Sequence, residues 1–159
     1  GCWFGRWGVN YIYGTSGALS ALANIAPEKS SGALNRGAEW LLQRQNDDGG
    51  WGESCRSYTD PLFRGIGEST ASQSAWAMIG LLAFAGLNQR NKNQVRQSLN
   101  RGANYLVRNQ RPDGTWNEDN FTGTGFPGHF YLKYHLYQQH FPLTALGGYA
   151  ALEGFDPKS

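Results

Sequence analysis

The stretch RGAEWLLQRQNDDGGW at Arg36–Trp51 returns as RGANYLVRNQRPDGTW at Arg101–Trp116. The Arg, Leu, Gln and Trp positions of the two copies all stand 65 residues apart, with no gap inside the window of 16 residues. A self-similar unit longer than one helix predicts a repeat architecture, in which each unit buries its apolar face against its neighbours.

The chain opens with a third, truncated copy of this unit. Gly1–Trp3 repeats the Gly-x-Trp that closes the two full copies, and the helix and glutamine that should precede it are missing. We therefore expect the chain to be a fragment of a longer protein, read as one domain over residues 1–159.

Composition excludes several classes of protein. The 159 residues are enough to bury a core, and a net charge of +2 with scattered basic residues does not favour nucleic-acid binding. Two distant cysteines, Cys2 and Cys55, give neither a disulfide framework nor a metal spacing, so we expect no metal and no cofactor. The longest apolar run, Ala75–Leu87, has 13 residues, fewer than the roughly 20 that span a membrane.

Two kinds of helix alternate along the chain. Amphipathic patterns predict helices at Gly32–Arg44 and Asn93–Asn109, each with an apolar stripe at i, i+4 and i+7. Segments that are apolar on every side predict enclosed helices at Gly17–Ile25, Ser69–Ala85 and Leu143–Leu152. The first of these should begin at Thr15 or Ser16, and the last should follow Pro142.

Two loops and a short helix complete the predicted elements. Gly52–Gly67 is expected to be a polar loop and Asn117–Gly128 a glycine-rich one. Phe130–Tyr137 is expected to form a short helix with Phe130, Tyr134 and Tyr137 on one face. Strands have no comparable support, so the predicted class is all-α: inner and outer helices in about two and a half hairpins, a part of an α/α barrel.

The repeat resembles the Gln-Trp repeat of the triterpene cyclases, in which Lys/Arg-Gly-x-x-aromatic-Leu-x-x-x-Gln is followed by Gly-x-Trp. Three further stretches are similar, in order and spacing, to the C-terminal part of bacterial squalene–hopene cyclases: GCWFGRWGVNYIYGT, GGWGESCRSYTDP and GTGFPGHFYLKYHLY. The resemblance implies an α/α toroid of the kind that terpenoid cyclases share with protein prenyltransferases. It gives Gln45, Trp51, Gln110 and Trp116 a structural role, the Gln bridging two helices beneath the Trp ring.

The resemblance also implies an activity. Squalene–hopene cyclases fold squalene in a hydrophobic cavity, protonate one terminal double bond and form hopene or hopanol through carbocations. Aromatic rings suit this chemistry, because a ring stabilises a nearby cation by about 0.5 to 2 kcal/mol without trapping it as a nucleophile would.

Six aromatic residues match cavity positions of that family. By resemblance, Trp7 and Tyr13 help to position the substrate, Phe126 and Phe130 stabilise later cations, and Tyr134 and Tyr137 belong to the cavity wall. The alternative for each ring is ordinary core packing. His129 is assigned no role.

The family's proton donor lies in an Asp-x-Asp-Asp motif that this sequence lacks. Asp47-Asp48 belongs to a repeat turn and Glu118-Asp119 to a loop. We therefore expect no catalytic acid here, an acid in a missing N-terminal part of the same enzyme, and an isolated fragment that is inactive.

Other functions and partners remain open at this stage. The cavity aromatics would also suit a related barrel acting on another isoprenoid, and a non-enzymatic helical repeat could bind lipid or protein. A zinc site like that of the prenyltransferases, with Cys55, Glu53, Asp60 and a distant His, has the wrong spacing. The resemblance implies a peripheral enzyme that takes squalene from the cytoplasmic side of a membrane, and it allows a homodimer.

Overall fold

The computed structural model describes residues 1–87 and 91–155; the parts of the predicted domain at 88–90 and 156–159 lie outside the described residues. Most of the described chain is helical, with short 3-10 turns at Cys55–Tyr58 and Pro61–Phe63. The helices are α1 (Tyr11–Ile25), α2 (Ser31–Gln43), α3 (Ala71–Ala85), α4 (Lys92–Arg108) and α5 (Tyr137–Leu152). A small antiparallel sheet joins β1 (Gly123–Phe126) to β2 (Phe130–Leu132).

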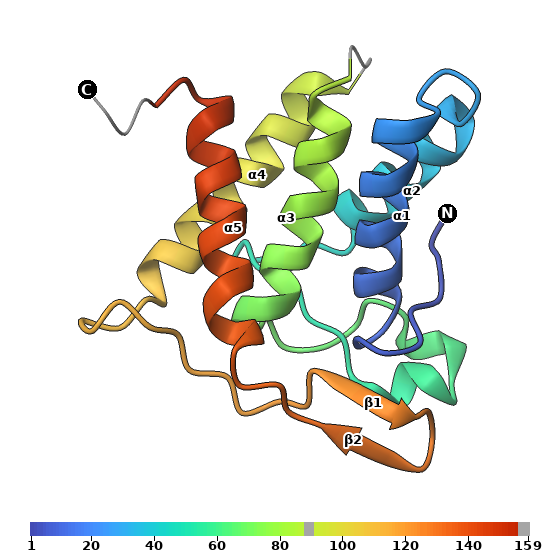
Figure 1. Ribbon diagram of the computed structural model, residues 1–159, viewed down its shortest axis with the longest axis vertical. Helices are drawn as coiled ribbons and strands as arrows, with labels where there is room; N and C mark the ends of the chain where they lie inside the picture. The colour runs from blue at the N-terminus through green and yellow to red at the C-terminus, as the bar shows by residue number, and fades with distance from the viewer. Residues whose placement is uncertain (88–90, 156–159) are drawn as a thin grey trace.

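The helices form two layers (Figure 1). α3 lies between α1 and α5 in one layer, and α2 and α4 pack behind it. Eleven of the 15 residues of α3 are buried, as its all-round apolar sequence predicts. α1 and α5 each keep an exposed face, around Gly17 and Ala21 on α1 and around Leu143 and Gly147 on α5. The prediction that all three are enclosed is therefore right for α3 alone.

The two amphipathic helices have the predicted buried stripes. Leu34, Ala38 and Leu41 of α2 are buried in the same core as the matching stripe of α4. That stripe consists of Val95, Leu99, Ala103 and Leu106. The alternation of enclosed and amphipathic helices along the sequence therefore corresponds to the two layers.

Two helices begin earlier than the sequence predicts. α1 starts at Tyr11 rather than Thr15, because the buried carboxylate of Glu53 accepts hydrogen bonds from the backbone N–H groups of Asn10 and Ile12. α5 starts at Tyr137 and contains Pro142. Its first turn is held by the Gln138 and Gln139 side chains, which donate to the carbonyl of Trp116. Both starts depend on contacts between segments distant in the sequence.

The predicted helix at Phe130–Tyr137 is wrong, and the all-α prediction is wrong at the same place. Phe130 to Leu132 pair with β1 across a turn in which Pro127 and Gly128 are the central residues. Gly128 has φ +80°, and the His129 N–H donates to the Phe126 carbonyl at 3.0 Å. Pro followed by Gly with positive φ is the sequence of a type II turn. The turn and the sheet together override the helical spacing of the aromatic residues.

Candidate functional site

Three of the six predicted cavity aromatics come from the hairpin end of the molecule. The backbone of Trp7 pairs with β1, since Thr124 N–H donates to its carbonyl at 2.9 Å. Phe126 and Phe130 face each other across the hairpin, with ring centroids 5.8 Å apart at 63°. Trp7, Phe126 and Phe130 are 55%, 59% and 44% exposed, so none of these rings is part of the buried core.

Gly123 brings the hairpin and the segment after it together. A Cβ at this position would clash with the Trp7 carbonyl and would come within 3.1 Å of the Tyr134 ring. Tyr134 N–H is held by the Thr122 hydroxyl at 2.8 Å. Glycine at 123 therefore lets the Trp7 backbone and the Tyr134 ring approach the same strand.

The other three predicted residues lie around a tryptophan that the sequence analysis did not select. Trp76 of α3 makes edge-to-face contacts with Tyr13 of α1 at 5.0 Å and with Tyr137 of α5 at 5.8 Å. Tyr134 stacks on Tyr137 at 4.8 Å. Phe141, also not selected, packs on Trp76 at 5.5 Å and on Tyr137 at 5.0 Å. Trp76 lies in an apolar segment and Phe141 follows the polar Gln138–His140, so no sequence pattern marks either residue as part of this group.

We call the cluster of Trp76, Tyr13, Tyr137, Tyr134 and Phe141 the aromatic wall. Its rings range from buried to exposed. Trp76 is 2% exposed, Tyr13 and Tyr137 are half-buried, and Tyr134 is 41% exposed. Burial raises the pKa of Tyr137, so its hydroxyl stays protonated at neutral pH and adds no charge to the wall. Neutral rings of this kind can attract a cation through their π faces and cannot neutralise it as a carboxylate would.

The repeat residues make matching contacts in the two copies. Trp51 and Trp116 are buried, and their indole N–H groups donate to the carbonyls of Leu41 and Leu106 at 2.8 Å in both cases. Gln45 and Gln110 each donate to the glycine carbonyl four residues on. Gln45 also exchanges hydrogen bonds with the carbonyl and hydroxyl of Ser98 in α4. Gln45 therefore connects the end of one outer helix to the next.

The opening Gly1–Trp3 occupies the same place against α2 as Gly49–Trp51 does against α4. The Trp3 ring lies against Gly37, where a Cβ would come within 2.7 Å of it, and the Trp51 ring lies equally close to Gly102 at 2.9 Å. The N–H groups of Trp3 and Trp51 are held by hydroxyls of the adjacent inner helices, Thr15 and Ser74.

Two glutamates extend the repeat beyond its tryptophan, and the sequence analysis missed them. Glu53 and Glu118 each follow the repeat Trp by two residues, and both are buried. Glu53 caps the start of α1, and Glu118 accepts from the N–H and hydroxyl of Ser72 at the start of α3 at 2.9 and 2.7 Å. A carboxylate at a helix N-terminus satisfies free N–H groups and complements the helix dipole. Their spacing of 65 residues was the signal that could have found them.

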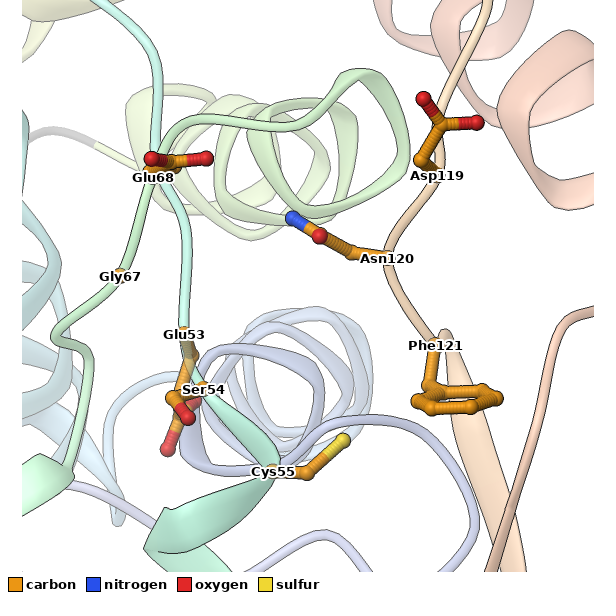
Figure 2. Close-up of a pocket in the computed structure, with 8 residues that line it drawn as sticks. All are labelled: Glu53, Ser54, Cys55, Gly67, Glu68, Asp119, Asn120 and Phe121. Atoms are coloured by element: carbon orange, nitrogen blue, oxygen red, sulfur yellow. The ribbon is translucent and has the colours of Figure 1, made fainter.

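A separate pocket of about 390 Å³ lies beside the loop after Trp51 (Figure 2). Its lining consists of Glu53, Ser54, Cys55, Gly67, Glu68, Asp119, Asn120 and Phe121. None of the six predicted cavity aromatics lines it, and the exposed carboxylates of Glu68 and Asp119 make it unsuited to a hydrocarbon. Burial raises the pKa of Cys55 to about 11, so this thiol is neither a ready nucleophile nor a ready metal ligand.

Two further findings concern the described residues alone. Within 1–87 and 91–155, no three His, Cys, Asp or Glu side chains are grouped so that they could hold a metal ion. No helix in these ranges combines the length and the hydropathy needed to cross a membrane.

Comparison with known families decides the relationship that this geometry leaves open. The model of the squalene–hopene cyclase C-terminal domain matches residues 1–151. The chain belongs to this family. The expected resemblance to squalene–hopene cyclases is thereby confirmed.

The relatives of this cyclase domain come from different kinds of organism. The chain is 55% identical to the dammaradiene synthase of the plant Dryopteris crassirhizoma over 94% of its length. It is 45% identical to the squalene–hopene cyclase of Zymomonas mobilis over 96% and 49% identical to that of Alicyclobacillus acidocaldarius over 94%. The similarity therefore extends beyond bacterial enzymes. The chain spans 23%, 22% and 22% of these three relatives.

Proposed function

We propose that this chain is the C-terminal part of a longer triterpene cyclase, and that the full-length enzyme converts squalene to hopene or hopanol. Family membership supports a cyclase, and two of the relatives are named squalene–hopene cyclases. The observation that carries the proposal is the aromatic wall. Tyr13 and Tyr137, which are far apart in the chain, both contact Trp76, and Tyr134 stacks on Tyr137. A neutral aromatic surface is what a migrating cation requires.

The two groups of rings have different parts in this proposal. Trp7 and Tyr13 help to fix the folded substrate, while Tyr134 and Tyr137 cover one side of the cavity. Phe126 and Phe130 stabilise cations formed late in the cascade. The two phenylalanines meet edge to face, and at 59% and 44% exposure neither ring is enclosed by the described residues. A ring face stabilises a nearby cation by about 0.5 to 2 kcal/mol. That is enough to change the ratio between further cyclisation of a carbocation and its premature loss of a proton.

The remaining parts of the active site belong to the rest of the enzyme in this proposal. The proton donor and the opposite cavity wall lie in the N-terminal part, and the complete α/α toroid encloses the substrate. The enzyme is a peripheral protein on the cytoplasmic side of the membrane and takes squalene from the interior of the bilayer. Neither metal nor cofactor takes part, because protonation, ring closure and the final step, either proton loss to give hopene or capture of water to give hopanol, need only acids, bases, water and π surfaces.

The test is the product made by the full-length enzyme. Purified enzyme incubated with detergent-dispersed squalene should yield hopene or hopanol, identified by gas chromatography with mass spectrometry. An enzyme that consumes no squalene and no other linear triterpene would contradict the proposal.

The identity of 55% with dammaradiene synthase supports a second candidate. In that case the same aromatic wall would serve a cyclase of the same class that ends its cascade at a dammaradiene-type product. The same incubation separates the two candidates, because the products differ in retention time and fragmentation.

A further inference from the structure

We propose that Trp76 is a positioning residue that sets the product of the cyclase by holding Tyr13 and Tyr137 in place. The inference rests on the proposed function and extends it to a residue that no motif identifies. Trp76 is 2% exposed and lies behind Tyr13 and Tyr137, so it acts through the two tyrosines and not on the substrate.

The geometry of the three inner helices places this ring where it links their side chains. Trp76 meets Tyr13 at 71° and Tyr137 at 79°, both edge to face. Phe141 is the third ring that contacts Trp76, at an interplanar angle of 75°. Edge-to-face contacts are directional, since the positive edge of one ring meets the negative face of another. A side chain without a ring could fill the volume and would not fix these angles.

Close helix packing makes the position rigid. The hydroxyl of Ser16 in α1 donates to the Trp76 carbonyl, and a Cβ on Gly80, one turn along α3, would come within 2.8 Å of the Ser16 Cα. The backbones of α1 and α3 are therefore in near contact beside the ring. The Trp76 side chain therefore projects from a backbone fixed against α1 and is itself 2% exposed, so it supports the two tyrosines from behind.

The indole itself is costly at this position, which argues against a purely structural role. Its Nε1–H is buried and has no hydrogen-bond partner among the described residues. A buried unpaired donor costs about 1 to 3 kcal/mol. Phenylalanine or leucine would avoid that cost, and natural sequences depart from local optima mostly at functional sites.

The test compares variants of the full-length enzyme. Trp76→Leu should raise the fraction of incompletely cyclised products roughly tenfold while squalene consumption continues, because initiation depends on residues outside this chain. Trp76→Phe, which keeps a ring, should restore most of the wild-type profile. Phe84→Leu is the matched control: Phe84 is equally buried in α3 and meets no other aromatic ring among the described residues. It should lower the melting temperature without changing the products.

Products are analysed below the melting temperature of every variant, and Trp76→Met replaces Trp76→Leu if the latter does not fold. If the ringless variant gives the same products as Phe84→Leu, Trp76 is ordinary core and the inference is wrong. An equal shift in Trp76→Phe would also overturn it, because the ring would then not be the determinant. If the wild-type enzyme cyclises no linear triterpene, the proposed function fails instead.

Discussion

At the scale of single residues, Phe130 offers the sharpest test of the cavity assignment. Its ring is 44% exposed and faces only Phe126 among the aromatic contacts of the hairpin. In the full-length enzyme, Phe130→Ala should release incompletely cyclised products. Initiation should stay intact, because the proposed proton donor lies outside this chain and Phe130 is proposed to stabilise only a late cation. Loss of a ring that stabilises one late cation changes partitioning about tenfold for each 1.4 kcal/mol. Mass spectrometry of the products gives the measurement.

Phe121→Ala is a suitable control for Phe130→Ala. Phe121 is a similarly exposed ring that packs on Tyr131 and has no proposed contact with the substrate. Both variants should keep their stability, and only Phe130→Ala should alter the products. An unchanged product profile would make Phe130 a packing residue, and loss of all turnover together with thermal stability would leave packing as its dominant role.

The two repeat glutamines should differ in their contribution to stability. Gln45 is half-buried and exchanges hydrogen bonds with Ser98 as well as Gly49, whereas Gln110 is exposed and bonds Gly114. In the chain of residues 1–159, Gln45→Ala should lower the free energy of unfolding by about 1 to 3 kcal/mol, because buried partners lose their bonds. Gln110→Ala should cost less than about 1 kcal/mol. Urea titration measures both, and equal losses would contradict the bridging role of Gln45.

Sequence reasoning at this scale succeeded where residues repeat and failed where contacts cross the chain. Trp51 and Trp116 repeat at a constant spacing of 65 residues, which predicts equivalent positions, and their indole N–H groups make equivalent hydrogen bonds. Glu53 and Glu118 repeat in the same register two residues beyond the tryptophans, outside the 16-residue window that defines the repeat. Trp76 has no counterpart in a motif, and only the packing of three helices shows which rings it touches.

At the scale of helices and strands, the start of α3 depends on a carboxylate from a distant loop. Burial raises the pKa of Glu118 above its ordinary value of 4.5. The folded protein therefore binds the proton of the Glu118 carboxyl group more tightly than the unfolded chain does. The stabilisation is complete below the unfolded pKa and declines as the pH rises from that value through the folded pKa.

Glu118→Gln should therefore flatten the pH dependence of stability. A glutamine does not titrate, and its oxygen still accepts from the Ser72 N–H, so the free energy of unfolding should fall less than in the wild type as the pH rises from about 4 to about 7. Urea titration across this range gives the measurement. Glu118→Ala is the comparison, because it leaves the buried Ser72 N–H unpaired and should be about 1 to 3 kcal/mol less stable than Glu118→Gln at every pH. A wild-type slope in Glu118→Gln would show that another group is responsible.

The elements that were predicted well are those whose pattern is long. Thirteen to 17 residues of periodic sequence define α2 and α4 to within one residue at each end. The eight residues at Phe130–Tyr137 match a helix at three aromatic positions, yet Pro127-Gly128 just before them fixes a turn. A helical spacing over only eight residues predicts structure less reliably than a Pro-Gly pair, which specifies a turn. The early starts of α1 and α5 could not be predicted, since their anchors come from Glu53 and Trp116.

At the scale of the whole molecule, exposure decides what the chain can do alone. α1 and α5 leave apolar faces uncovered, and the phenylalanines of the hairpin are open to water. The layered arrangement of helices could be predicted from the sequence. Whether the layers close into a toroid is a property of the complete enzyme, and the local periodicity of this chain carries no information about it.

The isolated chain of residues 1–159 should therefore form no cyclic product from squalene. Protonation of an alkene needs an unusually strong acid in a dry cavity. The buried Glu118 is a weaker acid than usual because its pKa is raised, and the pKa of Asp113 and of Glu153 is lowered on side chains that are open to solvent. Any cation formed beside Phe126 or Phe130, at 59% and 44% exposure, would meet water before a second ring could close.

The measurement is incubation of the purified chain with squalene, with the full-length enzyme as the positive control and circular dichroism as the check that the helices have formed. Hopene or any other cyclic triterpene above the level of a heat-treated sample would contradict the prediction. Such a result would mean that an acid among these 159 residues can start the cascade, and the division of the active site between this chain and the rest of the enzyme would have to be abandoned.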